Sequence, residues 1–123
     1  MKFKFFIGGF YNGHFEIILK KENLICFISN YPLNPLEPTH TFSIVEDTDW
    51  EILVQYLRTL QWKSFYEAGM YDGTQWTLEF KTEEINIKSY GSNAYPKGFK
   101  KLLRLLNNIT EKHRIHKKFV TIP

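Results

Sequence analysis

The sequence predicts an α+β fold, in which an antiparallel β-sheet of about five to six strands carries two amphipathic helices on one face. Several segments place apolar residues at every second position, which is typical of strands with one buried face. Two others repeat apolar residues every three or four positions, which is typical of helices packed on a core. The order β-β-β-(β)-α-β-β-α is that of a two-layer domain.

An antiparallel meander is predicted at the beginning of the chain. Alternating apolar residues predict strands near residues 2–7 and 15–20, and the pair Asn12-Gly13 between them is typical of a tight hairpin turn. Residues 24–29 are apolar at both phases of the alternation, which predicts a central strand.

A proline-rich segment follows, with Pro32, Pro35 and Pro38 inside seven positions. Proline lacks the N–H that a helix or a central strand needs, so this segment is expected to be a surface connection. Residues 41–45 then predict a further short strand.

The first helix is predicted to begin near residue 48. Thr48 and Glu51 match the capping box, with Thr48 as the N-cap and Glu51 reaching back to it. The helix then presents one apolar face, formed by Trp50, Leu53, Val54, Leu57 and Leu60. Packing on the core is the default function of such a face, and binding a partner is the alternative.

A second hairpin and a closing helix are predicted in the last half. A turn at Asp72-Gly73 precedes a strand near residues 74–80 and a second strand near residues 85–90. The inward positions are predicted to be Trp76, Leu78, Phe80, Ile85, Ile87 and Ser89. The last helix is predicted to begin near Pro96, with proline at its first position. Its buried stripe is predicted to be Phe99, Leu102, Leu103, Leu106 and Ile109.

The composition indicates which class of protein the chain belongs to. A chain of 123 residues with 43% apolar residues is expected to form one domain, residues 1–123, with its own core. The one cysteine, Cys26, lies in an apolar run and has no partner for an internal disulfide, which favours a reducing compartment. No secretory signal or membrane-spanning run is recognisable, so we expect a cytoplasmic protein.

The charges are unevenly distributed. Residues 37–84 hold ten acids and three bases, whereas residues 85–123 hold nine bases and one acid, although the whole chain carries only +3. These two segments either face each other in the fold or are presented to a partner, and the sequence does not choose between the two.

A ligand site is one hypothesis for the turn from Tyr90 to Lys97. Backbone N–H groups at a helix start, near lysines, attract anions, and aromatic rings could stack on a base. The hypothetical ligand-binding residues are Trp76, Tyr90, Ser92, Asn93, Tyr95 and Lys97. The alternative is purely structural, in which Gly91 and Asn93 form the turn and Pro96 holds Tyr95 extended.

Other chemistry has less support. His113 and His116 have a usable metal spacing, but the basic residues around them disfavour a cation, so we expect no metal and no cofactor. No nucleophile or carboxylate has an assignable partner, which favours a protein that is not an enzyme. The basic last third makes nucleic acid or a nucleotide a possible ligand, although the signature of an RNA-recognition sheet is absent.

The segment YDGTQWTLEF (Tyr71–Phe80), followed by INIKSYGSNAYPKGFKKLLRLL (Ile85–Leu106), resembles a small bacterial domain that has no known activity. In that domain a DGxxW strand precedes a YGxNxYPxxFxxL segment. The resemblance covers about Tyr71–Leu106, and it implies a fold unit and a bacterial source.

We therefore expect a small non-enzymatic bacterial binding protein, similar in size and style to immunity and anti-defence proteins, which act by blocking a partner. It would recognise a protein or other macromolecule through a charged surface, for which the candidates are Lys100, Lys101 and Arg104. Binding of a nucleotide or another phosphorylated small molecule at the Tyr90–Lys97 turn is the alternative. A homodimer formed through a free edge strand of the opening meander is also compatible with the sequence.

Overall fold

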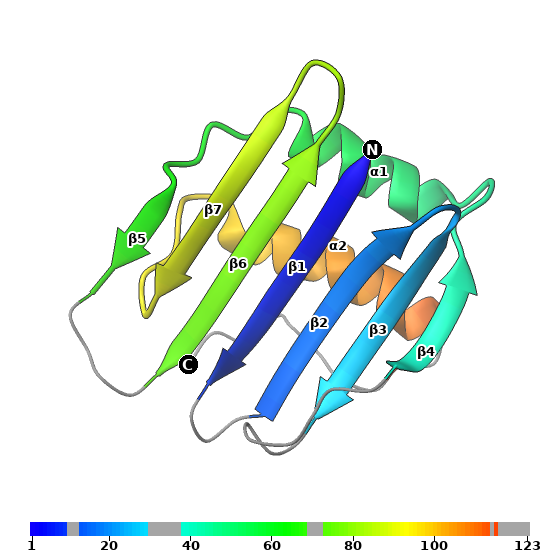
Figure 1. The fold of residues 1–123 in the computed structure, drawn as a ribbon, viewed down its shortest axis with the longest axis horizontal. Helices are drawn as coiled ribbons and strands as arrows, with labels where there is room; N and C mark the ends of the chain where they lie inside the picture. Colours follow the sequence, from blue (N-terminus) through cyan, green and yellow to red (C-terminus); the bar gives the residue numbers. More distant parts are fainter. Residues whose placement is uncertain (10–12, 30–37, 69–72, 114, 116–123) are drawn as a thin grey trace.

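The chain has the predicted α+β fold. The computed structural model describes residues 1–9, 13–29, 38–68, 73–113 and 115, and Figure 1 shows a sheet of seven strands with two helices behind it. The strands are β1 (Lys2–Gly9), β2 (Gly13–Lys20), β3 (Asn23–Ser29), β4 (Pro38–Ser43), β5 (Phe65–Glu67), β6 (Thr74–Lys81) and β7 (Asn86–Ser92). The helices are α1 (Thr48–Leu57) and α2 (Phe99–Lys112).

The sheet has the order β4-β3-β2-β1-β6-β7-β5. The strands of the first half form an antiparallel meander, and β6 then pairs with the free side of β1. Phe5 is consequently opposite Ile17 on one side and opposite Leu78 on the other. The first strand of the chain therefore lies in the middle of the sheet.

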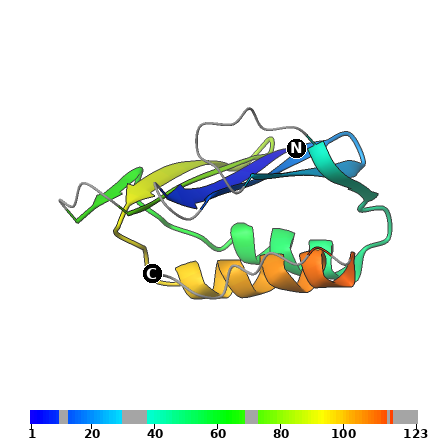
Figure 2. The same ribbon diagram turned by 90° about the horizontal axis from the view of Figure 1, so that it is seen from below.

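Both helices cover the same face of the sheet, as Figure 2 shows from the side. They run antiparallel, because Asp47 at the start of α1 contacts Lys112 at the end of α2, and Tyr56 near the end of α1 contacts Gly98 at the start of α2. Among the residues that the structure describes, no helix lies on the opposite face of the sheet (Figure 2). In the described part of the chain the sheet thus has one face covered by the helix layer and one face without helices, which we call the open face.

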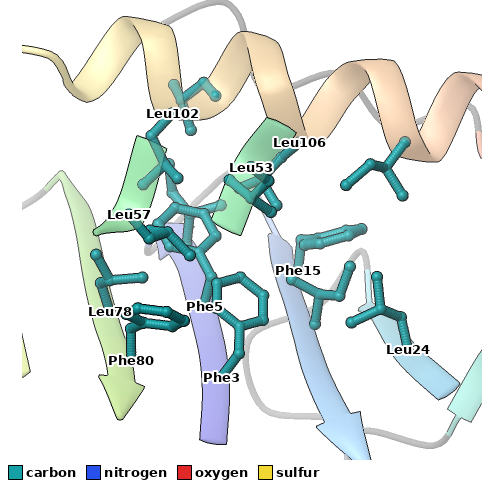
Figure 3. Close-up of a cluster of buried hydrophobic side chains, with 14 of the residues drawn as sticks. Phe3, Phe5, Phe15, Leu24, Leu53, Leu57, Leu78, Phe80, Leu102 and Leu106 are labelled. Atoms are coloured by element: carbon teal, nitrogen blue, oxygen red, sulfur yellow. The ribbon is translucent and has the colours of Figure 1, made fainter. Parts of the chain in front are cut away.

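Between the sheet and the helices lies a core of aromatic and leucine side chains (Figure 3). Phe3 and Phe5 of β1 are fully buried and meet Trp50 of α1 and Phe99 of α2, respectively. Burial of one such side chain contributes about 1.5–3 kcal/mol. The fully buried side chains labelled in Figure 3 are Phe3, Phe5, Phe15, Leu24, Leu53, Leu57, Leu78, Phe80, Leu102 and Leu106.

The sheet has more strands than the five to six predicted. The additional strand is β5, whose three residues pair in parallel with β7. A three-residue strand is too short to show an alternating pattern, so the sequence does not reveal it. The edges of the sheet are β4 and β5, and the strands β1, β2 and β3 of the meander are all paired on both sides.

The start of each helix differs from its prediction. The N-cap of α1 is Asp47 rather than Thr48, because the Asp47 carboxylate accepts a hydrogen bond from the N–H of Trp50. Helix α2 begins at Phe99, not near Pro96, and its N-cap is Gly98 with a φ of 90°. Four of the five residues in the predicted stripe of α1 are buried in the helix, while Leu60 lies beyond its end.

Parts of the predicted turns lie outside the described residues. This is the case for Asn12 and Asp72, for Pro32 and Pro35, and for the second histidine of the proposed metal pair, His116. Pro38 is described and begins β4, an edge strand, where a missing N–H is tolerated.

Candidate functional site

Trp76 of β6 faces the helix layer. Its side chain is 1% exposed, and its ring centroid lies 4.9 Å from that of Phe99 and 5.7 Å from that of Trp62. Its indole N–H donates a hydrogen bond of 2.9 Å to the carbonyl oxygen of Ala94. Trp76 therefore anchors the segment between β7 and α2 to the core.

Tyr90 of β7 faces the other way. It is 48% exposed, and it is paired across the sheet with Thr77, the residue after Trp76. Because neighbouring residues of a strand point to opposite faces, the rings of Tyr90 and Trp76 lie on opposite sides of the sheet. They do not form one stacking surface.

Asn93 follows β7 and closes the end of the β6–β7 pair. Its side-chain oxygen accepts a hydrogen bond from the N–H of Thr74, and its own N–H donates to the carbonyl oxygen of Thr74, both at 2.9 Å. Its φ of 55° is in the left-handed region that asparagine tolerates better than most residues. The N–H that would have cradled an anion is thus engaged in the backbone of the fold.

The start of α2 is fixed by hydrogen bonds from side chains of α1 and of the segment that follows it. The hydroxyl of Tyr56 donates a hydrogen bond of 2.7 Å to the carbonyl oxygen of Gly98, and the indole of Trp62 donates one of 3.1 Å to that of Lys97. Tyr95 packs against Phe99 with ring centroids 5.0 Å apart. Gly98 has a φ of 90°, which L side chains rarely adopt, and a Cβ atom there would lie 2.3 Å from the Tyr56 hydroxyl, so a larger residue would be strained at this position.

The six hypothetical ligand residues are thus divided between two places. Tyr90 and Ser92 line a hollow of about 270 Å³ at the open sheet face, together with Phe6, Phe65, Gln75, Thr77 and Gly91, whereas Trp76 borders this hollow from its strand while its ring is buried in the helix layer. Asn93, Tyr95 and Lys97 do not line it and instead belong to the connection that leads into α2.

Three basic residues, Lys100, Lys101 and Arg104, are exposed on the outer side of α2. The ammonium of Lys101 lies 4.9 Å from the centroid of the Tyr56 ring, a cation–π distance. Among the described residues none of the three forms an ion pair, and no acid occurs in the first turn of α2. We call these three residues the basic face of α2.

The end of α2 is different, because there the positive charge is neutralised. Lys112 Nζ lies 2.7 Å from a carboxylate oxygen of Asp47 and 3.2 Å from one of Asp49. Next to it, the ring of His113 stacks on Phe42 with centroids 3.8 Å apart. Part of the charge asymmetry in the sequence is therefore resolved inside the fold, where the acidic start of α1 meets the basic end of α2.

The environment of this cluster shifts two pKa values in opposite directions. Burial alone would raise the pKa of Asp47, but hydrogen bonds from Lys112 and from the N–H of Trp50 outweigh burial and hold that pKa below its ordinary value. Burial would lower the pKa of Lys112, but its bonds to Asp47 and Asp49 raise that pKa above the ordinary value. Both shifts keep the pair ionised.

Burial raises the pKa of the Cys26 thiol to about 12, so this cysteine is not a nucleophile at neutral pH. Within the described ranges, no group of three or more His, Cys, Asp or Glu residues could hold a metal ion. None of the helices in the described part of the chain is long and apolar enough to cross a membrane.

Comparison with known proteins gives no match, since no family model fits the chain and neither a curated protein nor a solved structure is similar to it. The resemblance of residues 71–106 to a small bacterial domain therefore stays an expectation from the sequence.

Two residues of the open face are not among the site residues that the sequence predicts. Phe6 is an aromatic residue at the outward phase of β1, and Lys4 precedes it at the same phase. The signal was present, because Phe6 breaks the alternation of Lys2, Phe3, Lys4 and Phe5. An aromatic residue out of phase in an alternating strand indicates a ring on the open face of the sheet.

Proposed function

We propose that this protein is a non-enzymatic binding protein that recognises an acidic protein partner through the basic face of α2. The observation that carries the proposal is that the basic residues of this helix differ in whether they have an ion-pair partner. Lys112 is held by two aspartates, whereas Lys100, Lys101 and Arg104 are exposed and have no ion-pair partner among the described residues. Such a patch favours encounter with a negatively charged surface.

The rigid attachment of the basic face supports this function. The buried side of α2 includes Phe99, Leu102, Leu103, Leu106 and Ile109, all 1% exposed or less. Tyr56 also fixes the start of the helix at Gly98 and lies under the ammonium of Lys101. The cations therefore stand on a fixed helix, which lowers the conformational entropy lost on binding. Action by occupying a partner's surface, as immunity and anti-defence proteins do, is compatible with this arrangement.

The test compares the wild-type protein with the triple variant Lys100→Glu, Lys101→Glu, Arg104→Glu as baits for partners in a lysate of the native host. We expect the wild type to capture a partner whose recovery falls strongly with the triple variant. A matched control variant carries the same charge change elsewhere, at the exposed residues Lys20, Lys21 and Lys63, and should capture as much as the wild type.

With the identified partner purified, the association rate should decrease as salt is raised, because steering by exposed charges is screened. Retained affinity in the triple variant would remove the basic face of α2 from consideration. Equal losses in the triple variant and in its control would show that only the overall charge matters, and would also contradict the proposal.

A further inference from the structure

The open sheet face carries a repeated pair of a lysine and an aromatic residue. Strand β1 presents Lys4 and Phe6 on this face, and strand β7 presents Lys88 and Tyr90. The two strands run in the same direction, because each is antiparallel to β6 between them. Each lysine therefore precedes its aromatic residue along the same direction, about 7 Å away on the same strand.

The two pairs are also in register. Lys4 and Lys88 both stand opposite Glu79 of β6, while Phe6 and Tyr90 both stand opposite Thr77. One row of the face is thus lysine–glutamate–lysine and the next row is aromatic–threonine–aromatic. The two rings are separated by two strand spacings, about 9–10 Å.

Each row borders a hollow of different character. The aromatic row borders the hollow of about 270 Å³ that Phe6, Phe65 and Tyr90 line, and Tyr90 and Phe65 are 48% and 43% exposed there. The lysine row borders a second hollow of about 210 Å³, which is lined by Lys2, Glu79, Phe80, Lys81, Asn86, Ile87 and Lys88. Flat apolar surface and positive charge therefore lie side by side.

The charge of the face is positive. The outward positions of β1, β2, β5, β6 and β7 hold five lysines (2, 4, 20, 81 and 88) against three acids, Glu16, Glu67 and Glu79, and Glu16 stands opposite Phe6. Glu79 lies 3.4 Å from the ammonium of Lys2 and 3.8 Å from that of Lys88, whose side chains are 66% and 78% exposed. Exposed pairs of this kind contribute little to stability and can be exchanged for contacts with another anion.

We propose that this open face binds single-stranded nucleic acid, with bases stacked on Tyr90 and Phe6 and phosphates near Lys88 and Lys4. Unpaired bases offer a flat π surface to an aromatic side chain at every nucleotide, and lysines beside them follow the phosphate backbone. The repetition of the lysine–aromatic pair fits a repeating ligand better than a single nucleotide. This site is on the sheet side of the molecule, opposite the basic face of α2, and it goes beyond the function proposed above.

The first experiment measures fluorescence anisotropy of labelled single-stranded RNA and DNA of mixed sequence, about 10 nucleotides long. We expect saturable binding that weakens as salt increases, and weaker binding of a duplex of the same sequence, because its bases are paired and stacked internally. Mononucleotides should compete poorly.

The aromatic contribution is tested by Tyr90→Leu and Tyr90→Phe. Both keep apolar volume at an exposed position, but only phenylalanine keeps a π surface. Loss of one base-stacking contact should weaken binding by about tenfold in the Tyr90→Leu variant, while Tyr90→Phe should bind like the wild type. Circular dichroism checks that both variants are folded.

The lysine contribution is tested by the double variant Lys4→Gln, Lys88→Gln. Because each phosphate contact to a single strand contributes about 0.7 to the slope of log affinity against log salt, the slope should fall by about 1.4 in this variant. The matched control, Lys21→Gln with Arg58→Gln, makes the same charge change at exposed residues away from both proposed binding faces and should keep the wild-type slope.

The proposal is overturned by several results. One is equal weakening by the two double variants, which would indicate binding to net charge alone. Another is binding of mononucleotides as tightly as of the oligonucleotide. A third is absence of oligonucleotide binding, including the case in which light scattering shows a homodimer that Tyr90→Leu disrupts, since the face would then be an interface between two copies.

Discussion

The ammonium of Lys112, near the end of the chain, lies 2.7 Å from a carboxylate oxygen of Asp47, which is 65 residues away in the sequence. The same aspartate accepts a hydrogen bond from the N–H of Trp50 and so begins α1. One carboxylate thus satisfies an N–H at the start of one helix and fixes the end of the other. Its side chain is 6% exposed, so water does not replace these contacts easily.

Asp47→Ala should lower the free energy of unfolding by about 1–3 kcal/mol. The variant loses an N-cap, which contributes about 1 kcal/mol, and it leaves Lys112 without its shorter ion-pair contact. Denaturant titration followed by circular dichroism measures the change. Glu51→Ala is the control, because the exposed Glu51 belongs to the capping box that the structure does not use, and it should change stability by less than about 0.5 kcal/mol. Equal losses in the two variants would contradict the role of Asp47.

The stability of the protein should depend on pH through the ionisation of Asp47. Its folded-state pKa is lower than its ordinary value, so its contribution is present above the ordinary carboxyl pKa of about 4 and is lost as the pH falls through the folded pKa. The difference in Tm between the wild type and Asp47→Asn should therefore be largest near neutral pH and shrink in acid. Thermal unfolding between about pH 7 and pH 2 tests this, and a constant difference would mean that Asp47 does not titrate with folding.

Asn93→Ala should destabilise the fold rather than abolish the binding of a ligand. The substitution removes the oxygen that accepts the N–H of Thr74, and it places alanine at a φ of 55°. Together these effects should cost about 1–3 kcal/mol in the free energy of unfolding. Asn93→Gly is the matched comparison, because glycine tolerates this φ but also lacks the hydrogen bond, so it should lie between alanine and the wild type. If Asn93→Ala were as stable as the wild type, the side-chain hydrogen bond between Asn93 and Thr74 would not contribute to stability.

Cys26 should be inert toward thiol reagents while the protein is folded. The side chain is fully buried in β3, and burial raises the pKa of its thiol to about 12. At about pH 8 an aromatic disulfide reagent should react far more slowly with native protein than with protein in denaturant. Because the chain holds a single cysteine, the slow rate also reports opening of the core, and it should rise in the Asp47→Ala variant. A fast native reaction would place Cys26 outside the core.

The period of the apolar residues was sufficient to predict the elements and their inner faces. Trp76, Leu78 and Phe80 were predicted inward in one strand, and all three are 1% exposed or less. The buried residues Phe99, Leu102 and Leu103 of the last helix follow from the same reasoning. Apolar residues that repeat every two or every 3.6 positions are a local property of the chain, so the buried face of an element can be predicted without knowledge of the other elements.

The tertiary structure decided which elements meet. The pairing of β1 with β6 joins residues about 70 positions apart, and no local pattern encodes it. This pairing places Phe6 and Tyr90 on the two sides of Thr77. Nor does a local pattern encode the ion pair that joins Asp47, the N-cap of α1, to Lys112 at the end of α2. Contacts between distant segments depend on the sum of packing and electrostatics over the whole molecule. The sequence alone thus determined a sheet with two helices, and only the folded chain determined which side chains share a surface.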